Sequence, residues 1–205
     1  MQLSDYYNTI DIPGTAEYKD RGSRFIARAV PVKNLADCKL KLAEIKKEYP
    51  KASHYCFAYR LGLDNNQFRV SDDGEPSGSA GRPILGQIDS REVTDVLIVV
   101  IRYFGGTLLG VPGLINAYKS AAAMVLQVTP LVRRPVLISH ELEFDYTRMN
   151  EVMTIVKQFD CQVQKQELQL FCTMEIGIPL FRLDETLMRF GDIRDISVKA
   201  SKVSA

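Results

Sequence analysis

The sequence predicts an α+β protein with two domains. Stretches with the two-residue period of strands are interspersed with stretches whose apolar residues recur every three or four positions, as in amphipathic helices. These periodic patterns are interrupted at Thr129-Pro130 and again by the sequence RRP at 133–135. With 205 residues, 46% of them hydrophobic, the chain can bury two cores. We therefore expect one domain over residues 1–130 and a second over 131–205.

The first half of the N-terminal domain is expected to form a strand, a helix and a hairpin. Residues 24–32 fit a strand, and 35–49 fit a helix that Asn34 caps and Pro50 ends. Residues 54–61 and 68–70, separated by a polar turn, favour a hairpin. In the first of these strands one face would carry His54, Cys56, Ala58 and Arg60.

The clearest strand follows in the same domain. Residues 96–101 read VLIVVI, a run that is typical of a strand buried on both faces. A short helix is expected before it, starting near Arg82-Pro83, because proline suits a first helical turn. A longer helix is expected after it, from Leu114 to about Val128. Its buried face would hold Ala117, Ala121, Met124 and Val128.

The C-terminal domain reads as strand, helix, strand, strand, helix, strand. This order is the split βαβ, or ferredoxin-like, pattern. The expected strands cover 136–144, 161–164, 168–178 and 193–198, and the expected helices cover 149–159 and 184–190.

Composition narrows the classes of function. A net charge of +1 gives no basic field of the kind that strong non-specific nucleic-acid binders carry. The four cysteines form no CxxC pair and so predict neither a zinc site nor a disulfide framework. Residues 1–20 do not resemble a signal peptide, and the sequence contains no apolar run of 18 residues. We expect a cytoplasmic protein with no membrane contact and no cofactor, and the oligomeric state stays open.

The loop at 71–86, SDDGEPSGSAGRPILG, stands out from the rest of the chain. Ordering four glycines with so little apolar surface costs backbone entropy, which suggests a binding role. Its first half holds Asp72, Asp73 and Glu75, which with His54 could bind a metal and support a hydrolase. The structural alternative is that the two aspartates satisfy turn amides and that Glu75 pairs with Arg82.

The second half of the loop suits an anion. Backbone N–H groups at a helix start and a nearby guanidinium can together hold a phosphate. Arg102, Tyr103 and Phe104, at the end of the buried strand, would add charge and stacking for RNA. Alternatively the glycines permit tight packing and the aromatic residues belong to the core. The candidate nucleic-acid or anion site comprises Arg60, Ser77, Gly78, Ser79, Gly81, Arg82, Arg102, Tyr103, Gly105 and Gly106.

Three segments carry a family resemblance: ASHYCFAYRLG at 52–62, SDDGEPSGSAGRPIL at 71–85 and VVIRYFGGTLLGVPGLINAY at 99–118. They resemble the signature blocks of the IMPACT family and its bacterial YigZ branch. The resemblance implies an N-terminal domain like the second domain of a small-subunit ribosomal protein, and a ferredoxin-like C-terminal domain like the last domain of elongation factor G. The positions that match the family are His54, Arg60, Asp72, Asp73, Glu75, Ser77, Arg82, Arg102, Tyr103, Gly105 and Gly106.

The same resemblance implies a role in translation. The family's eukaryotic namesake regulates translation by competing for the activator of a kinase that reports amino-acid starvation. This chain has Leu108, Pro112 and Asn116 where the family usually has lysine, glycine and arginine, so two cations are missing. We expect a non-enzymatic binding protein that contacts RNA, the ribosome or a translation-related protein. A metal-assisted hydrolase and a pure protein-interaction module remain as alternatives.

Overall fold

The structure is a computed structural model that describes residues 4–64 and 66–201. The chain divides into two compact units, which we call the N-terminal unit, residues 7–134, and the C-terminal unit, residues 135–201 with 4–6. Strand β1 (Tyr6–Ile10) pairs with β7 (Leu131–Pro135), so both strands contain a boundary between the units. Helices and antiparallel strands occur together in each unit, as expected for an α+β protein.

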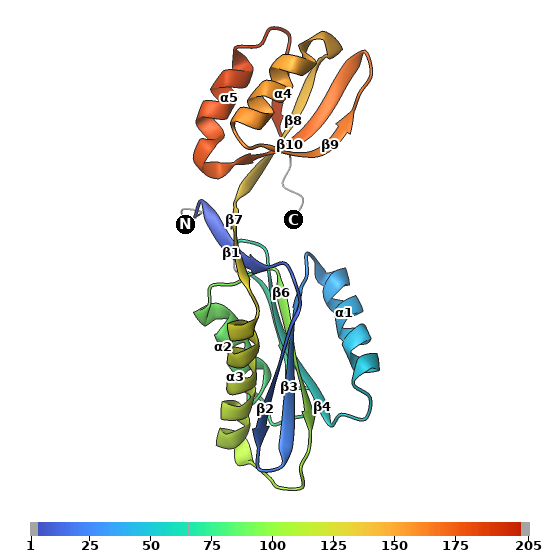
Figure 1. Ribbon diagram of the computed structural model, residues 1–205, viewed down its shortest axis with the longest axis vertical. Helices are drawn as coiled ribbons and strands as arrows, with labels where there is room; N and C mark the ends of the chain where they lie inside the picture. The colour runs from blue at the N-terminus through green and yellow to red at the C-terminus, as the bar shows by residue number, and fades with distance from the viewer. Residues whose placement is uncertain (1–3, 65, 202–205) are drawn as a thin grey trace. The chain divides into compact units, whose positions relative to one another are not determined.

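The N-terminal unit is built on a five-stranded antiparallel sheet in the order β2-β3-β6-β4-β5. One helix covers one face of this sheet and two cover the other (Figure 1). The strands are β2 (Gly14–Asp20), β3 (Ser23–Pro31), β4 (His54–Leu61), β5 (Gln67–Ser71) and β6 (Val96–Tyr103), and the helices are α1 (Leu35–Glu48) on one face with α2 (Gly81–Ser90) and α3 (Gly110–Val128) on the other.

The central strand β6 confirms the prediction of burial on both faces. Val96, Ile98 and Val100 pack in the core beneath α2 and α3, whereas the alternate residues between them pack beneath α1. Strand β4 confirms its predicted faces in the same way, because Cys56 and Ala58 lie on the α2 and α3 side. Two cores on either side of one sheet hold that sheet in place. They fix the ends of β4, β5 and β6 at the edge of the sheet where the loop between β5 and α2 lies.

Helix α1 begins as predicted, whereas α3 differs from prediction in its start and in its buried face. Asn34 does cap α1, since its side chain accepts the Asp37 N–H at 2.9 Å. Helix α3 begins at Gly110, four residues before the expected start. Its expected buried face is wrong at Met124 and at Val128, which is 61% exposed. The buried stripe of α3 consists of Leu114, Ala117, Tyr118, Ala121, Ala122, Val125 and Leu126, because these are the positions that face the sheet and α2.

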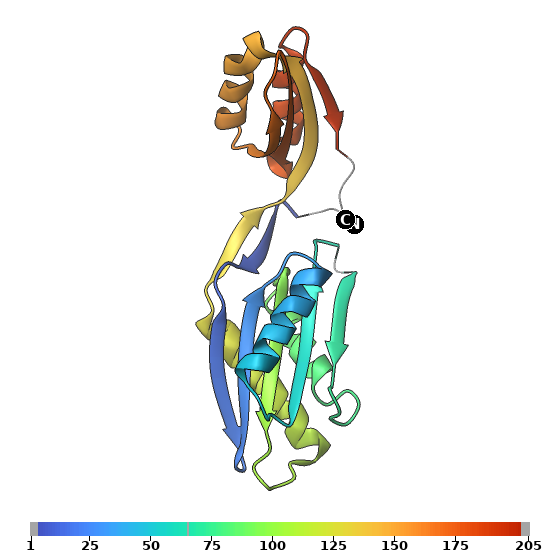
Figure 2. The ribbon, with the colours of Figure 1, turned by 90° about the vertical axis from the view of Figure 1, so that its right-hand side faces the viewer.

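The C-terminal unit has the predicted order of strands and helices. Its antiparallel sheet runs β11-β8-β10-β9, with both helices packed into one core (Figures 1 and 2). Leu168 and Leu170, expected in a strand, instead precede β10 and are exposed. The last strand starts four residues late, because Asp195 has a φ of 61° that no strand adopts. The elements are β8 (Leu137–Asp145), η1 (Tyr146–Arg148), α4 (Met149–Gln158), β9 (Gln162–Glu167), β10 (Phe171–Pro179), η2 (Leu180–Arg182), α5 (Leu183–Gly191) and β11 (Ser197–Ala200).

Candidate binding surface

The signature loop, residues 72–80, lies at one end of the N-terminal sheet. Strand β5 leads into it at Ser71, which pairs with Phe57 of β4. At the same end His54 starts β4 and lies opposite Arg102, near the end of β6. The sheet register therefore brings the three segments with the family resemblance together, although they are far apart in the sequence.

Asp72 organises the second half of this loop. Its carboxylate accepts three backbone N–H groups, from Gly78 at 2.8 Å, Ala80 at 3.0 Å and Gly81 at 2.8 Å. Burial acts to raise the pKa of Asp72, but these hydrogen bonds and the nearby Arg82 hold it below its usual value. The sequence predicts that the backbone amides at the start of α2 could bind an external anion. In the structure these amides already bind the Asp72 carboxylate.

Gly81 is required by a close approach of two backbone segments. A Cβ atom at this position would lie 2.8 Å from the Ser71 nitrogen and 2.9 Å from the Val70 side chain. Such contacts are shorter than packed atoms tolerate. The glycine therefore serves tight packing, which is the structural alternative considered from the sequence.

Asp73 fastens the first half of the loop to β4. Its carboxylate accepts the Tyr55 N–H at 2.7 Å, and its carbonyl oxygen lies 2.8 Å from His54 Nδ1. Asp73 also has a φ of 44°, a conformation in which aspartate is among the better tolerated residues. The Asp73 carboxylate thus binds the backbone of β4, whereas the Asp72 carboxylate binds amides of the turn itself.

Glu75 is buried, and its partner is Arg102, so the pairing with Arg82 considered above is wrong. Arg102 Nη1 donates to Glu75 Oε1 at 2.6 Å, and the Tyr118 hydroxyl donates to the same oxygen at 2.8 Å. The guanidinium lies between the rings of Phe25 and Phe104, with 5.4 Å to each centroid. Arg102 is 5% exposed, so it stabilises the loop and has little surface to offer a ligand.

The carboxylates of the loop do not assemble as metal ligands. Within the part of the chain that the structure describes, no group of three or more His, Cys, Asp or Glu side chains is arranged to hold a metal ion. Burial raises the pKa of the neighbouring Cys56 thiol to about 12, so this thiol is protonated at neutral pH and is a poor nucleophile.

Several other candidate residues lie apart from the loop. Arg60 is at the opposite end of β4, where it pairs with Asp89 and covers the Phe68 ring. Tyr103 faces the α1 side of the sheet and donates from its hydroxyl to the Pro50 carbonyl at 3.2 Å. Gly105 packs against Gly22, where a Cβ atom would lie 2.0 Å from a backbone carbon.

Three large apolar side chains of the segment from the end of β6 into α3 are exposed, those of Phe104, Leu108 and Val111. Arg82, in the first turn of α2, and Ser77 are exposed, whereas the Ser79 hydroxyl is buried and donates to the Pro76 carbonyl. Leu108 is 82% exposed between two glycine turns. In the sequence, Leu108 is an apolar residue at a position where the family usually has a lysine. We define the signature surface as Ser77, Arg82, Phe104, Leu108 and Val111.

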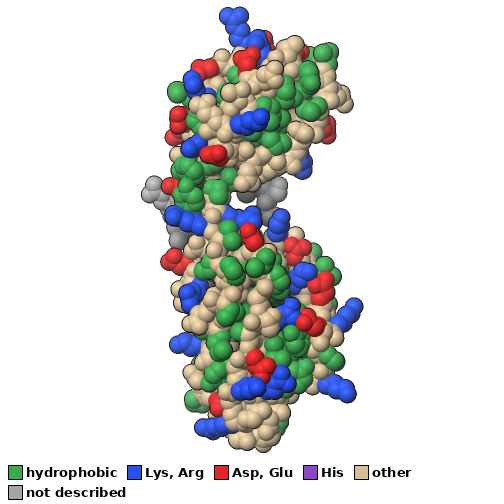
Figure 3. Space-filling model, in the orientation of Figure 1, with side chains coloured by type: hydrophobic (Ala, Val, Ile, Leu, Met, Phe, Trp, Pro, Cys, Tyr) green, Lys and Arg blue, Asp and Glu red, His purple; other side chains and the backbone are tan. Residues whose placement is uncertain are grey.

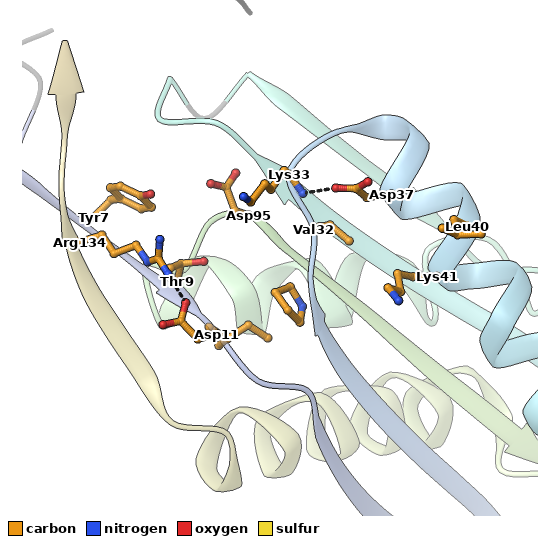
Figure 4. A pocket seen from close by; sticks show the side chains of 12 residues that line it. Tyr7, Thr9, Asp11, Val32, Lys33, Asp37, Leu40, Lys41, Asp95 and Arg134 are labelled. Atoms are coloured by element: carbon orange, nitrogen blue, oxygen red, sulfur yellow. Dashed lines mark hydrogen bonds and ion pairs between the residues drawn. The ribbon is translucent and has the colours of Figure 1, made fainter. Parts of the chain in front are cut away.

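A separate cavity of about 490 Å³ lies elsewhere in the N-terminal unit (Figure 4). Tyr7, Asp95 and Arg134 line it, and burial raises the pKa of Asp95. None of its lining residues is among the functional candidates that the sequence predicts. Its charged lining is balanced in sign, which gives no preference for an anionic or a cationic ligand: Asp11, Asp37 and Asp95 face Lys33, Lys41 and Arg134.

The chain is similar to known proteins over most of its length. The family described as "Impact N-terminal domain" matches residues 21–126. "IMPACT family member YigZ" of Escherichia coli is 30% identical over 88% of this chain and 89% of its own length. "Protein IMPACT" of Bos taurus is 36% identical over 44% of this chain and 30% of its own length.

A solved structure has the same fold over almost the entire chain. It is described as "Crystal structure of an hypothetical protein" and superposes with a TM-score of 0.78 at 27% identity, covering 98% of this chain and all of that one. In the described residues, moreover, no helix has both the length and the apolar character needed to cross a bilayer.

Proposed function

Because the chain belongs to the IMPACT family, we propose that it is a non-enzymatic binding protein that takes part in the regulation of translation. Its signature surface would contact the ribosome or a translation factor. The observation that carries this proposal is the exposure of Leu108 and Phe104 beside a loop whose carboxylates all have partners within the chain. Exposed apolar side chains that gather on one surface are typical of contacts with other macromolecules.

The charges around the loop favour a contact that includes protein over a grip on RNA alone. Phosphate-backbone binding requires several free cations, and each contributes to the salt dependence of the affinity. Of the two arginines that the sequence offered here, Arg102 is used internally and Arg82 is exposed. On the face of the N-terminal unit seen in Figure 3, basic and acidic side chains are interspersed. In this proposal the RNA that the protein contacts is part of a ribosome.

The domain resemblances belong to the same proposal. An N-terminal unit like the second domain of a small-subunit ribosomal protein, and a C-terminal unit like the last domain of elongation factor G, would suit a partner in translation. Fold alone does not give function, so these likenesses support the class of partner and not its identity.

Cosedimentation tests the proposal. The protein is mixed with purified ribosomes, with ribosomal RNA stripped of protein, or with neither, at 50 mM and 200 mM salt. We expect saturable binding to ribosomes at both salt concentrations and binding to stripped RNA that falls steeply with salt. Equal affinity for stripped RNA and ribosomes would favour an RNA-binding protein, and failure to sediment with ribosomes at 50 mM salt would contradict a ribosomal partner.

A further inference from the structure

The C-terminal sheet has one face that its own unit leaves open. Leu142, Phe144 and Met174 point into the core with α4 and α5. Neighbouring residues along a strand point to opposite faces, so the residues between them lie on the other side of the sheet. Both helices of this unit lie on the core side (Figures 1 and 2). Among the residues of the C-terminal unit that the structure describes, no helix covers the opposite face.

This open face is acidic. Glu141 lies opposite Glu175 in the strand register, a like-charge pair that destabilises a sheet unless something compensates for it. Lys199 pairs with Glu143 at 2.9 Å and Lys165 with Glu175 at 3.2 Å. The open-face positions in these rows hold two lysines against five carboxylates, which are Glu141, Glu143, Asp145, Glu167 and Glu175.

The carboxylates of β8 form a line with a regular spacing. Glu141, Glu143 and Asp145 occupy alternate positions of one strand, so they repeat at roughly 6.8 Å. Lys199 lies opposite Glu141 in the register of β11 and β8, but its ion pair is with Glu143. An extended peptide with a cationic side chain at every second position has the same repeat and could place a charge over each carboxylate.

An exposed apolar side chain, that of Phe171, lies beside the last carboxylate of this line. A groove of about 490 Å³ is lined by Asp145, Phe171 and Asp195, among others. Phe171 lies opposite Asp145 in the register and is 75% exposed, and the preceding Leu170 is 72% exposed. Exposed aromatic and aliphatic side chains beside carboxylates suit an arginine or lysine, whose aliphatic stem packs while its charge is paired.

We propose that the open face of the C-terminal sheet binds an extended, basic segment of a partner protein, with its basic side chains along β8 and an apolar side chain against Phe171. RNA does not fit this face, because its phosphates would meet the carboxylates. A free polyamine would satisfy the charges but has no side chain to cover the exposed Phe171 ring. The proposal concerns a different surface from the signature surface and does not depend on the proposed function.

A synthetic peptide of sequence GRSRSRSLSL provides the probe, since its arginines and leucines share one face when it is extended. Its binding to the full chain is measured by fluorescence anisotropy at 50 mM salt. We expect saturable binding that is at least tenfold weaker for GESESESLSL. The double variant Glu141→Gln with Glu143→Gln should bind the arginine peptide at least tenfold more weakly, and Phe171→Ser should also weaken binding.

The matched control is Glu151→Gln with Glu185→Gln, which removes the same charge from the helices of the same unit and should change the affinity less than twofold. Hydrogen exchange would add amide protection on β8 and β10 in the presence of the peptide. Equal weakening by the control variant, equal binding of the glutamate peptide, or complete competition by an equimolar polyamine would overturn the proposal.

Discussion

The signature loop is stabilised by charged side chains that form hydrogen bonds and ion pairs with other groups of the chain. Asp72 binds three backbone N–H groups, and Glu75 binds Arg102 and Tyr118. The sequence predicts correctly that Asp72 would satisfy turn amides, but the Asp73 carboxylate binds the Tyr55 N–H of β4 instead. The sequence does not reveal that Glu75 reaches Arg102, because that contact depends on the register between β4 and β6 and joins residues 27 positions apart.

Replacing Asp72 tests the first of these interactions. Hydrogen bonds to a charged acceptor contribute about 2 kcal/mol, so Asp72→Asn should lower the free energy of unfolding of the N-terminal unit by about that amount at pH 7. The pKa of Asp72 is lowered in the folded state, so its contribution is present above the unfolded pKa and is lost as pH falls through the folded value. The difference from wild type in urea denaturation should therefore shrink below about pH 4. A constant difference from pH 7 to pH 3, or a loss as large in the exposed control Glu44→Gln, would contradict this role.

Replacing Arg102 tests the second interaction, the ion pair with Glu75. Removing one partner of a buried ion pair leaves an uncompensated charge, so Arg102→Met should cost about 3–5 kcal/mol of stability. The double variant Arg102→Met with Glu75→Gln removes both charges and keeps an acceptor for the Tyr118 hydroxyl. It should be more stable than Arg102→Met alone in the same denaturation experiment. A double variant whose losses simply add would mean that the two residues are not coupled.

At the level of whole elements, short α2 contains two glycines with opposite roles. A Cβ atom at Gly81 would clash with the backbone of Ser71, whereas one at Gly86 would meet nothing within 4 Å. We expect Gly81→Ala to destabilise the N-terminal unit by about 2 kcal/mol. Gly86→Ala should stabilise it by about 0.5–1 kcal/mol, because alanine is the better helix former. Thermal unfolding of both variants checks this, and a stabilising Gly81→Ala would refute the close approach.

Elements with a strong periodic pattern could be predicted, and those shaped by turns could not. All six residues at 96–101 are apolar, which is typical of a strand buried between two cores. The structure confirms this strand. Leu168 and Leu170 continue the alternation of β10, so the pattern alone places them in the strand. The structure leaves them exposed before β10, where the chain turns back from β9.

At the scale of the whole molecule, the sequence places a boundary at 130, and the structure divides the chain at 134–135 and again at 6–7. The second division could not be predicted, because residues 1–20 are polar and have no clear period, although β1 and β2 both lie within them. The signature surface likewise depends on the assembled N-terminal unit. Its exposed residues come from the signature loop, from the first turns of α2 and α3 and from the segment after β6, so no single segment contains them.

The central claim is that the signature surface carries the binding function. We would measure ribosome cosedimentation for wild type and for Arg82→Ala with Leu108→Ser, two exposed positions whose replacement should leave stability unchanged within about 0.5 kcal/mol. The matched control is Lys47→Ala with Leu40→Ser on the exposed side of α1. The account predicts at least tenfold weaker binding for the first variant and wild-type binding for the control. Wild-type binding by both variants would contradict it.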